Sequence, residues 1–217
     1  MDIVSFNWAR DLAGYEIVER SKRPDSTMIT DLTDRGGIYV VRRGGPMEPY
    51  EPLKIDGLYR RLADCDKTPE DALYFIKTFG YPDFKDNDEY PVISFYGIVD
   101  NMRQGVALAD QGEWGILADA FEGAIIKRYG VGNVSFVFHH REGDERPTVA
   151  FRPRSLMAAM WLQFALDCSG GGKLRKCKWC PQYFKYGSGT GRRKTAEYCS
   201  PKCQKAHTYA RREEATQ

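Results

Sequence analysis

The residues with the clearest capacity for chemistry are four cysteines near the end of the 217-residue chain. Two residues separate the first pair, eighteen separate the two pairs and three separate the second pair, giving Cys177, Cys180, Cys199 and Cys203. Pairs of cysteines at such spacings are typical of zinc sites, in which four thiolates complete a tetrahedral shell. The sequence therefore predicts one structural zinc ion, because a closed shell leaves no position for a substrate.

The residues next to each pair predict how the thiolates are positioned. Trp179 lies inside the first pair, where two intervening residues allow a tight knuckle that turns both sulfurs toward one ion. Ser200 and Pro201 lie inside the second pair and are typical of the N-cap and first turn of a helix. We therefore expect a helix to begin there and to carry Cys203 in its first turn.

The segment between the pairs is expected to form a short hairpin. Tyr183–Tyr186 and Ala196–Tyr198 are predicted to pair as strands across a loop at Gly187–Lys194. A knuckle, a hairpin and a helix in this order indicate a treble-clef zinc finger. A module of about 45 residues has little core of its own, so its folding is expected to depend on the metal.

Two alternatives concern the ligands and the thiols themselves. His207 lies one helical turn beyond the last cysteine, where it is able to replace one of the four ligands. A redox role for Cys177 and Cys180 leaves the second pair without an explanation. Cys65 and Cys168 stand alone beside apolar stripes, so both are predicted to be buried and unreactive.

The distribution of charge points to a polyanionic partner. Between residues 173 and 217, twelve Lys and Arg stand against three Glu, a net of +9, whereas the rest of the chain has twenty basic and twenty-seven acidic residues, a net of −7. Lys and Arg neutralise phosphates and position a protein on nucleic acid. The residues predicted to contact nucleic acid are Arg192, Arg193, Lys194, Lys205, Arg211 and Arg212.

The remainder of the chain predicts an α+β fold, mainly helical, with short strands. A Gly-rich stretch, Ser169–Gly172, coincides with the change in the sign of the charge and divides a domain at 1–169 from the zinc finger at 170–217. Alternating and β-branched residues predict strands, and apolar residues at helical spacing predict helices. The strands are expected at Tyr15–Arg20, Gly37–Arg42, Val134–Phe138 and Thr148–Phe151, and the helices at Ile55–Cys65, Thr68–Phe79, Pro91–Gln111, Trp114–Tyr129 and Ser155–Asp167.

The C-terminal segment resembles the CGNR-type zinc finger of bacterial stress-induced transcription regulators, in which the finger follows a helix-rich ABATE domain. The resemblance rests on Arg175–Cys180, Phe184, Arg192–Lys194, Tyr198–Cys203 and Ala210–Arg212. It departs from the family after the second pair, where Gln204, Lys205 and Ala206 stand in place of Gly, Asn and Arg. The resemblance implies control of transcription and favours DNA over RNA as the nucleic acid.

Composition and motifs argue against a membrane protein, a secreted protein and an enzyme. No apolar run approaches the roughly 18 residues of a membrane span, and the first ten residues do not form a secretory signal. We expect a cytoplasmic protein with no membrane partner. The chain has no nucleophile elbow, phosphate loop or pair of catalytic carboxylates, so we expect no enzyme activity. The N-terminal domain is expected to bind a small molecule or a partner protein, or to assemble into an oligomer.

A second hypothesis treats the finger as a protein-interaction module. Its +9 charge complements the −7 charge of the rest of the chain, so the finger is able to dock on its own N-terminal domain. This hypothesis predicts that Arg192, Arg193 and Arg212 face that domain rather than solvent.

Overall fold

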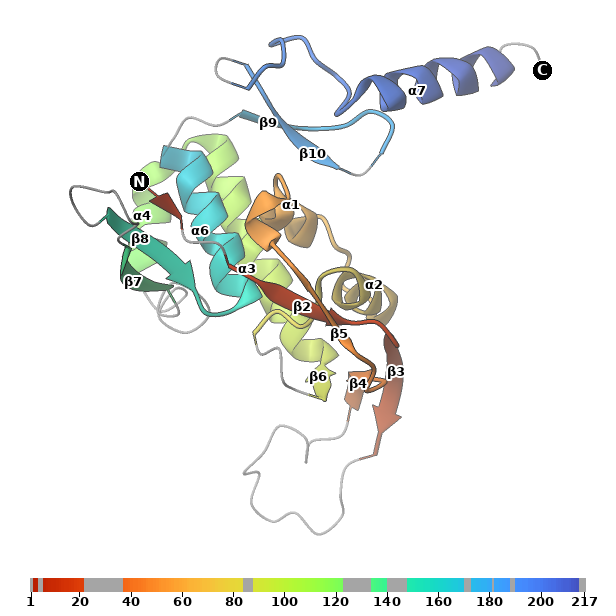
Figure 1. Ribbon diagram of the computed structural model, residues 1–217, viewed down its shortest axis with the longest axis vertical. Coiled ribbons are helices and arrows are strands. Elements are labelled where there is room, and N and C mark those ends of the chain that lie inside the picture. Colours follow the sequence, from red (N-terminus) through yellow and green to blue (C-terminus); the bar gives the residue numbers. More distant parts are fainter. Residues whose placement is uncertain are drawn as a thin grey trace.

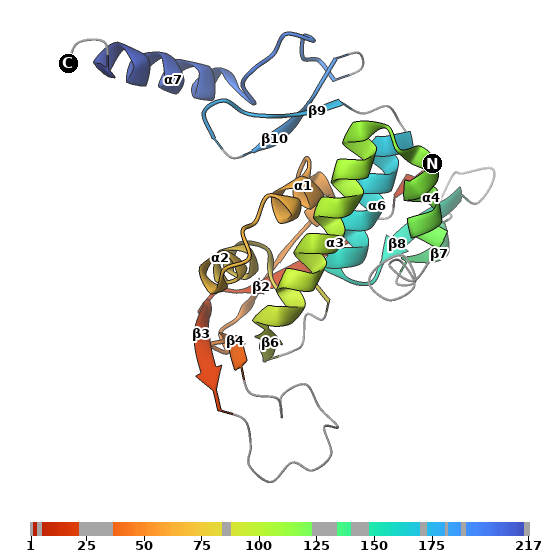
Figure 2. The same ribbon diagram turned by 180° about the vertical axis from the view of Figure 1, so that it is seen from behind.

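The computed structural model describes residues 2–3, 6–21, 37–83, 88–122, 134–139, 148–169, 173–180, 182–187 and 190–214. We call the described residues up to Ser169 the body and those from Lys173 the finger. Figures 1 and 2 show the finger at one end of the body, beside helix α1 and near the ends of α3 and α6. Helix and strand are mixed, as predicted for an α+β protein.

Ten short strands lie in the described part of the chain. The body contains an antiparallel sheet in the order β3-β4-β6, an antiparallel pair β2-β5, and a sheet in the order β1-β8-β7, in which β1 is parallel to β8. The strands of the body are β1 (Asp2–Ile3), β2 (Trp8–Asp11), β3 (Tyr15–Arg20), β4 (Gly37–Arg42), β5 (Met47–Tyr50), β6 (Glu89–Pro91), β7 (Val134–His139) and β8 (Thr148–Pro153).

All four strands predicted for the body are confirmed, and two of them keep their predicted bounds. The alternation of Tyr15–Arg20 and Gly37–Arg42 places them in register as an antiparallel pair. The Gly and Pro residues of Gly44–Pro52 predict an irregular segment, and this prediction is wrong because β5 lies inside it. Pro49 does not prevent this, since a strand at the edge of a two-stranded pair does not need every backbone donor.

Helices form the larger part of the body. Their bounds are α1 (Leu58–Ala63), α2 (Pro69–Phe79), α3 (Val92–Gln111), α4 (Trp114–Glu122) and α6 (Leu156–Ser169), with a short 3-10 turn, η2, at Pro52–Lys54. All five predicted helices are confirmed, although α1 is shorter than predicted. The predicted extension of α4 over 123–129 lies outside the described residues, as does the Gly-rich segment 170–172. No described helix is long and apolar enough to cross a bilayer.

Helix α2 shows how local sequence sets the bounds of an element. The Thr68 hydroxyl accepts a hydrogen bond from the Asp71 N–H at 3.2 Å, and Pro69 occupies the first turn. Gly80 ends the helix with φ at 79°, a conformation that glycine adopts without strain. An added Cβ at Gly80 would lie 2.5 Å from the Ala9 carbonyl oxygen, so the same glycine also lets β2 approach.

The core of the body lies between the helices and the small sheets. Helices α3 and α6 run side by side in both views (Figures 1 and 2). Gly105 of α3 makes room for the Trp161 ring of α6, because an added Cβ there would lie 3.1 Å from that ring. Trp161 packs edge-to-face on Phe164, which packs in the same way on Tyr59 of α1. These buried rings link three helices.

One buried side chain fixes α1 on α6. The Gln163 amide oxygen accepts a hydrogen bond from the Leu58 N–H at 2.9 Å, and its nitrogen donates to the Ile55 carbonyl at 2.8 Å. Gln163 thus satisfies a backbone donor at the start of α1 in the absence of a capping side chain on Gly57. The position of α1 matters for the finger, because the hairpin of the finger rests on it.

Candidate metal centre

The finger is built from one hairpin and one helix. Strand β9 (Lys173–Lys176) pairs antiparallel with β10 (Tyr183–Tyr186), and the first cysteine pair lies in the turn between them. Helix α7 (Pro201–Glu214) begins within the second pair, carries Cys203 in its first turn and extends away from the body (Figure 1). The cysteine pairs therefore lie in a turn and at a helix start, which are the two places the sequence predicted.

The predicted pairing of Tyr183–Tyr186 with Ala196–Tyr198 was wrong. Residues 196–198 form no strand, and β10 uses β9, which precedes the knuckle, as its partner. The later segment is held by single contacts instead: the Lys178 N–H donates to the Glu197 carbonyl at 3.1 Å, and the Arg175 guanidinium donates to the Ala196 carbonyl at 2.6 Å. Only Gly187 and Arg192 form a bridge across the predicted loop within the described residues.

The four predicted ligands converge. All four Sγ atoms lie within 4.8 Å of one another. The Cys180–Cys199 and Cys199–Cys203 sulfurs are 3.5 Å apart, and Cys203–Cys180 are 3.8 Å apart. A disulfide requires about 2.05 Å, whereas sulfurs at about 2.3 Å from one tetrahedral ion are separated by about 3.8 Å. The four cysteines are therefore free thiols placed to hold a metal ion.

Backbone donors and the helix start prepare the site for thiolates. Burial acts to raise the pKa of Cys177, but the N–H groups of Cys180, Cys199 and Trp179 outweigh it and lower this pKa to about 6. Burial and the neighbouring sulfurs raise the pKa of Cys199 to about 12. One thiolate thus forms readily, and a full set of four requires the charge of a bound cation.

The second pair is positioned by the cap of α7. The Ser200 hydroxyl accepts a hydrogen bond from the Cys203 N–H at 3.3 Å, which is the predicted N-cap contact. His207 lies outside the sulfur cluster. Its Nδ1 is 3.0 Å from the Tyr198 hydroxyl, and its ring packs edge-to-face on Trp179. Among the described residues the candidate ligands are therefore the four cysteines without His207.

The two remaining cysteines are partly buried and far less acidic than Cys177. Burial raises the pKa of Cys65 to about 12 and that of Cys168 to about 11, and nearby carboxylates add to both shifts. Both thiols stay protonated at neutral pH. This agrees with their predicted inertness, although each is only partly buried rather than enclosed.

Hairpin residues hold the finger on the body. The Asp64 carboxylate, just after α1, accepts from the Lys176 ammonium at 2.6 Å and from the Tyr183 hydroxyl at 2.8 Å. The Lys185 ammonium lies 2.9 Å from the carboxylate of Asp167, whose side chain is only 6% exposed. Leu174 packs against the core cluster of the body.

The sequence reasoning missed these docking residues. Tyr183 and Lys185 lie two residues apart on one strand and so share a face, which was a usable signal. Nothing local marks Asp64 or Asp167 as their partners, because the pairs are separated by 112, 119 and 18 positions in the chain. Gly57 allows the close approach: an added Cβ there would lie 2.7 Å from Cβ of Tyr183.

The basic residues of the finger fall into groups with different surroundings. Arg193 and Lys194 are exposed near the second cysteine pair, and Lys205, Arg211 and Arg212 are exposed on α7. Arg192 is half-buried inside the finger. Its guanidinium donates to the carbonyls of Lys185 and Cys199 at 3.3 and 3.1 Å and lies over the Phe184 ring. The ion pairs and hydrogen bonds of the hairpin with Asp64 and Asp167 do not use these arginines.

Charge pairing differs between body and finger. In the body, five of the nine described arginines have a carboxylate within 4 Å; the pairs include Arg10–Glu48, Arg20–Glu89, Arg43–Glu16 and Arg60–Asp110. Within the same described residues, six exposed cations of the finger have no such partner: Lys173, Arg193, Lys194, Lys202, Lys205 and Arg211.

Comparison of this chain with protein-family models, with curated proteins and with solved structures finds no match.

Proposed function

We propose that the protein binds a structural zinc ion through its four clustered cysteines and uses the finger to bind nucleic acid, DNA in the first instance, as a transcription regulator. Zinc suits the site because four thiolates at tetrahedral spacing are its usual structural shell. The arrangement of knuckle, hairpin and helix is consistent with a treble clef of the CGNR type. With all four positions taken by protein, the ion supports the fold rather than a reaction.

The observation that carries this proposal is the group of unpaired cations. Arg193, Lys194, Lys202, Lys205 and Arg211 are exposed and have no carboxylate partner among the described residues. Exposed like charges repel one another, so binding a polyanion relieves this repulsion. Each phosphate that a cation neutralises also releases a counterion, which favours binding. Helix α7 extends away from the body (Figure 1) and carries Lys205 and Arg211 as exposed side chains, where a duplex is able to approach.

A salt titration tests this function. Full-length, zinc-loaded protein is titrated against a fluorescein-labelled mixed-sequence duplex at several KCl concentrations, with fluorescence anisotropy as the readout. We expect log K to fall linearly with log salt. The double variant Lys205→Ala/Arg211→Ala should lower the slope by about 0.9 for each phosphate that it leaves without a cation. Lys67→Ala, which removes a paired cation of the body, serves as the control. Absence of binding to any duplex at low salt would overturn the proposal.

Metal identity is measured separately. Elemental analysis of protein purified without added metal is expected to give one zinc per chain, and Cys180→Ser to lose it. A Cys168→Ser variant should keep the metal, because Cys168 lies outside the sulfur cluster.

A second function has its own support. The contacts of Lys176 and Tyr183 with Asp64, and of Lys185 with Asp167, fasten the finger to the body. In this role the metal module serves mainly to complete the fold and to present a surface to another protein. Intact folding together with a failure to bind nucleic acid would favour it.

A further inference from the structure

A groove of about 610 Å³ separates the finger from the body, and it opens beside the metal centre. The body lines it with residues from α1 and from the segment that leads into α1, and the finger lines it with the knuckle, the hairpin and the start of α7. Its volume falls in the range of about 300–1,000 Å³ that is usual for ligand sites. The lining residues that matter here are Lys54, Asp56, Arg61, Trp179, Arg192 and Lys202.

The groove is cationic on both walls. Lys54 and Arg61 come from the body, and Arg192 and Lys202 come from the finger. Asp56 is the one carboxylate among the lining residues, and the ligands Cys180, Cys199 and Cys203 also line the groove, where four thiolates around one Zn²⁺ carry a net charge of −2. Arg61 and Lys202 have no carboxylate partner in the described part of the chain. Lys54 pairs with Glu51 at 2.9 Å, but an exposed pair of this kind is easily exchanged for another anion.

An aromatic ring lies in the same groove. Trp179 sits between two of the metal ligands and remains 46% exposed, although it contacts His207 edge-to-face. The knuckle holds its backbone, so the ring is presented by a fixed support. A large exposed ring beside cations is the usual platform for a nucleic-acid base, because every base has a face on which to stack.

We propose that this groove binds a single-stranded segment of nucleic acid, with one base stacked on Trp179 and the adjacent phosphates on Lys54, Arg61 and Lys202. The inference rests on the proposed function and specifies the form of nucleic acid. In a duplex the face of each base is covered by its neighbours, so a ring recessed in a groove meets only a base that has left the stack. The body is then part of the binding surface, and the finger does not act alone.

The test compares single strands with duplexes on the full-length, zinc-loaded protein. Labelled 12-nucleotide DNA and RNA strands of mixed sequence, and the matching DNA duplex, are titrated by anisotropy. Trp179→Ala is expected to weaken binding of single strands by about 5- to 100-fold, the contribution of one stacked base. Trp179→Phe should restore most of this loss, since a smaller ring still stacks. Trp114→Ala is the matched control, because Trp114 is 53% exposed and lies outside the groove.

A second variant tests the body wall without touching the finger. Lys54→Ala should lower the salt slope for single strands by about 0.7, the value for one phosphate contact. It should leave duplex binding by α7 unchanged. Lys67→Ala, another lysine in an exposed ion pair, should change neither. Metal content is measured for every variant; if Trp179→Ala loses its metal, Lys54→Ala and Trp179→Phe decide the question.

Failure of the proposed function and failure of the groove proposal give different results in these titrations. A wild-type protein that binds neither duplex nor single strand overturns the proposed function itself. A wild-type protein that binds both, with unchanged affinity and slope for single strands in the Trp179 and Lys54 variants, overturns only the groove. Stronger loss of duplex binding than of single-strand binding in Lys54→Ala would also contradict it.

Discussion

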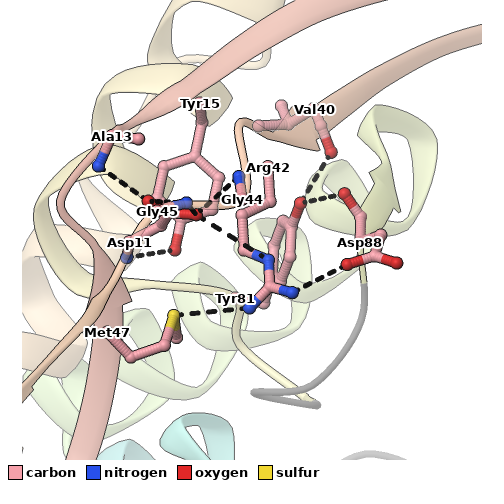
Figure 3. Close-up of polar contacts among 10 residues, drawn as sticks. All are labelled: Asp11, Ala13, Tyr15, Val40, Arg42, Gly44, Gly45, Met47, Tyr81 and Asp88. Atoms are coloured by element: carbon pink, nitrogen blue, oxygen red, sulfur yellow. Dashed lines mark hydrogen bonds and ion pairs between the residues drawn. The ribbon is translucent and has the colours of Figure 1, made fainter.

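At the scale of single residues, the carboxylate of Asp11 accepts several backbone hydrogen bonds within the body. It is fully buried and accepts from the N–H groups of Ala13, Gly44 and Gly45 at 2.7–3.1 Å (Figure 3). It thereby joins the turn after β2 to the turn before β5. Gly45 is required there, because an added Cβ would lie 2.7 Å from the Asp11 carboxylate.

Replacement of this carboxylate tests its role. Asp11→Asn turns one acceptor into a donor that faces backbone donors, so we expect a loss of about 1–3 kcal/mol in the free energy of unfolding. Urea denaturation followed by circular dichroism measures it. Glu16→Gln, which alters an exposed pair with Arg43, should change stability by less than about 0.5 kcal/mol. Equal losses in the two variants would show that the buried network contributes nothing special.

Residues differ in how far the sequence reveals them. The four metal ligands are predictable because their spacing alone restricts the chemistry. Asp11 and Gln163 are not. Apart from the neighbouring Ala13 N–H, the hydrogen-bond partners of the Asp11 carboxylate lie 33 to 34 positions away, and those of Gln163 lie 105 to 108 positions away. The same holds for Arg192: an arginine in a basic run resembles a surface contact, and only the fold shows that it donates to backbone carbonyls inside the finger.

At the scale of elements, α1 and β10 form a contact between body and finger. Gly57 precedes α1 with φ at 63°, and its missing Cβ makes room for Tyr183. Gly57→Ala places a methyl 2.7 Å from Cβ of Tyr183, so the hairpin must shift. We expect faster hydrogen exchange in β10 and a loss of about 1–3 kcal/mol from overpacking and backbone strain.

A glycine within a helix provides the matched comparison. Gly97 lies in α3 with nothing within 4 Å of an added Cβ. Gly97→Ala should stabilise the protein by about 0.5–1 kcal/mol and leave exchange in β10 unaltered. If Gly57→Ala behaves in the same way, the hairpin does not rest on α1 as described.

The carboxylate that receives the hairpin gives a further prediction. Asp64→Ala removes the acceptor for Lys176 and for the Tyr183 hydroxyl, whose pKa is raised by burial and by this carboxylate. Because both partners are half exposed, we expect a loss of only about 1–2 kcal/mol, confined to docking and visible as faster exchange in β9 and β10. Asp100→Ala, which breaks the Lys67 pair, should leave the finger unaffected.

Helices and strands were predictable where a signal in their own sequence determines their type and their bounds. Helix α2 has its cap, its first-turn proline and its terminal glycine within its own sequence, and β3 and β4 alternate clearly. The partner of β10 was not predictable, since a candidate segment lies close to it in the chain on either side. Pairing with β9 places the knuckle in the turn and brings Arg175 over the Tyr186 ring, a contact that residues 196–198 do not offer.

At the scale of the whole molecule, metal and body are coupled through the hairpin. Removal of the metal with a chelator should unfold the finger, because its own core is small. Lys185 then leaves Asp167, a buried carboxylate, and Leu174 leaves the core. We expect the body to stay folded but to melt about 2–8 °C lower, as measured by calorimetry with and without chelator. An unchanged transition for the body would show that the two parts are energetically independent.

The docking contacts also have a consequence for the order in which the parts of the chain fold. Asp64 and Asp167, which receive the finger, both precede Cys177 in the chain, and β8 completes its sheet before that point as well. Chains fold from the N-terminus as the ribosome releases them. The body is thus in place when the thiols emerge, and it acts as a template on which the hairpin is aligned. Metal capture becomes the last step of maturation, completed only when Cys203 joins.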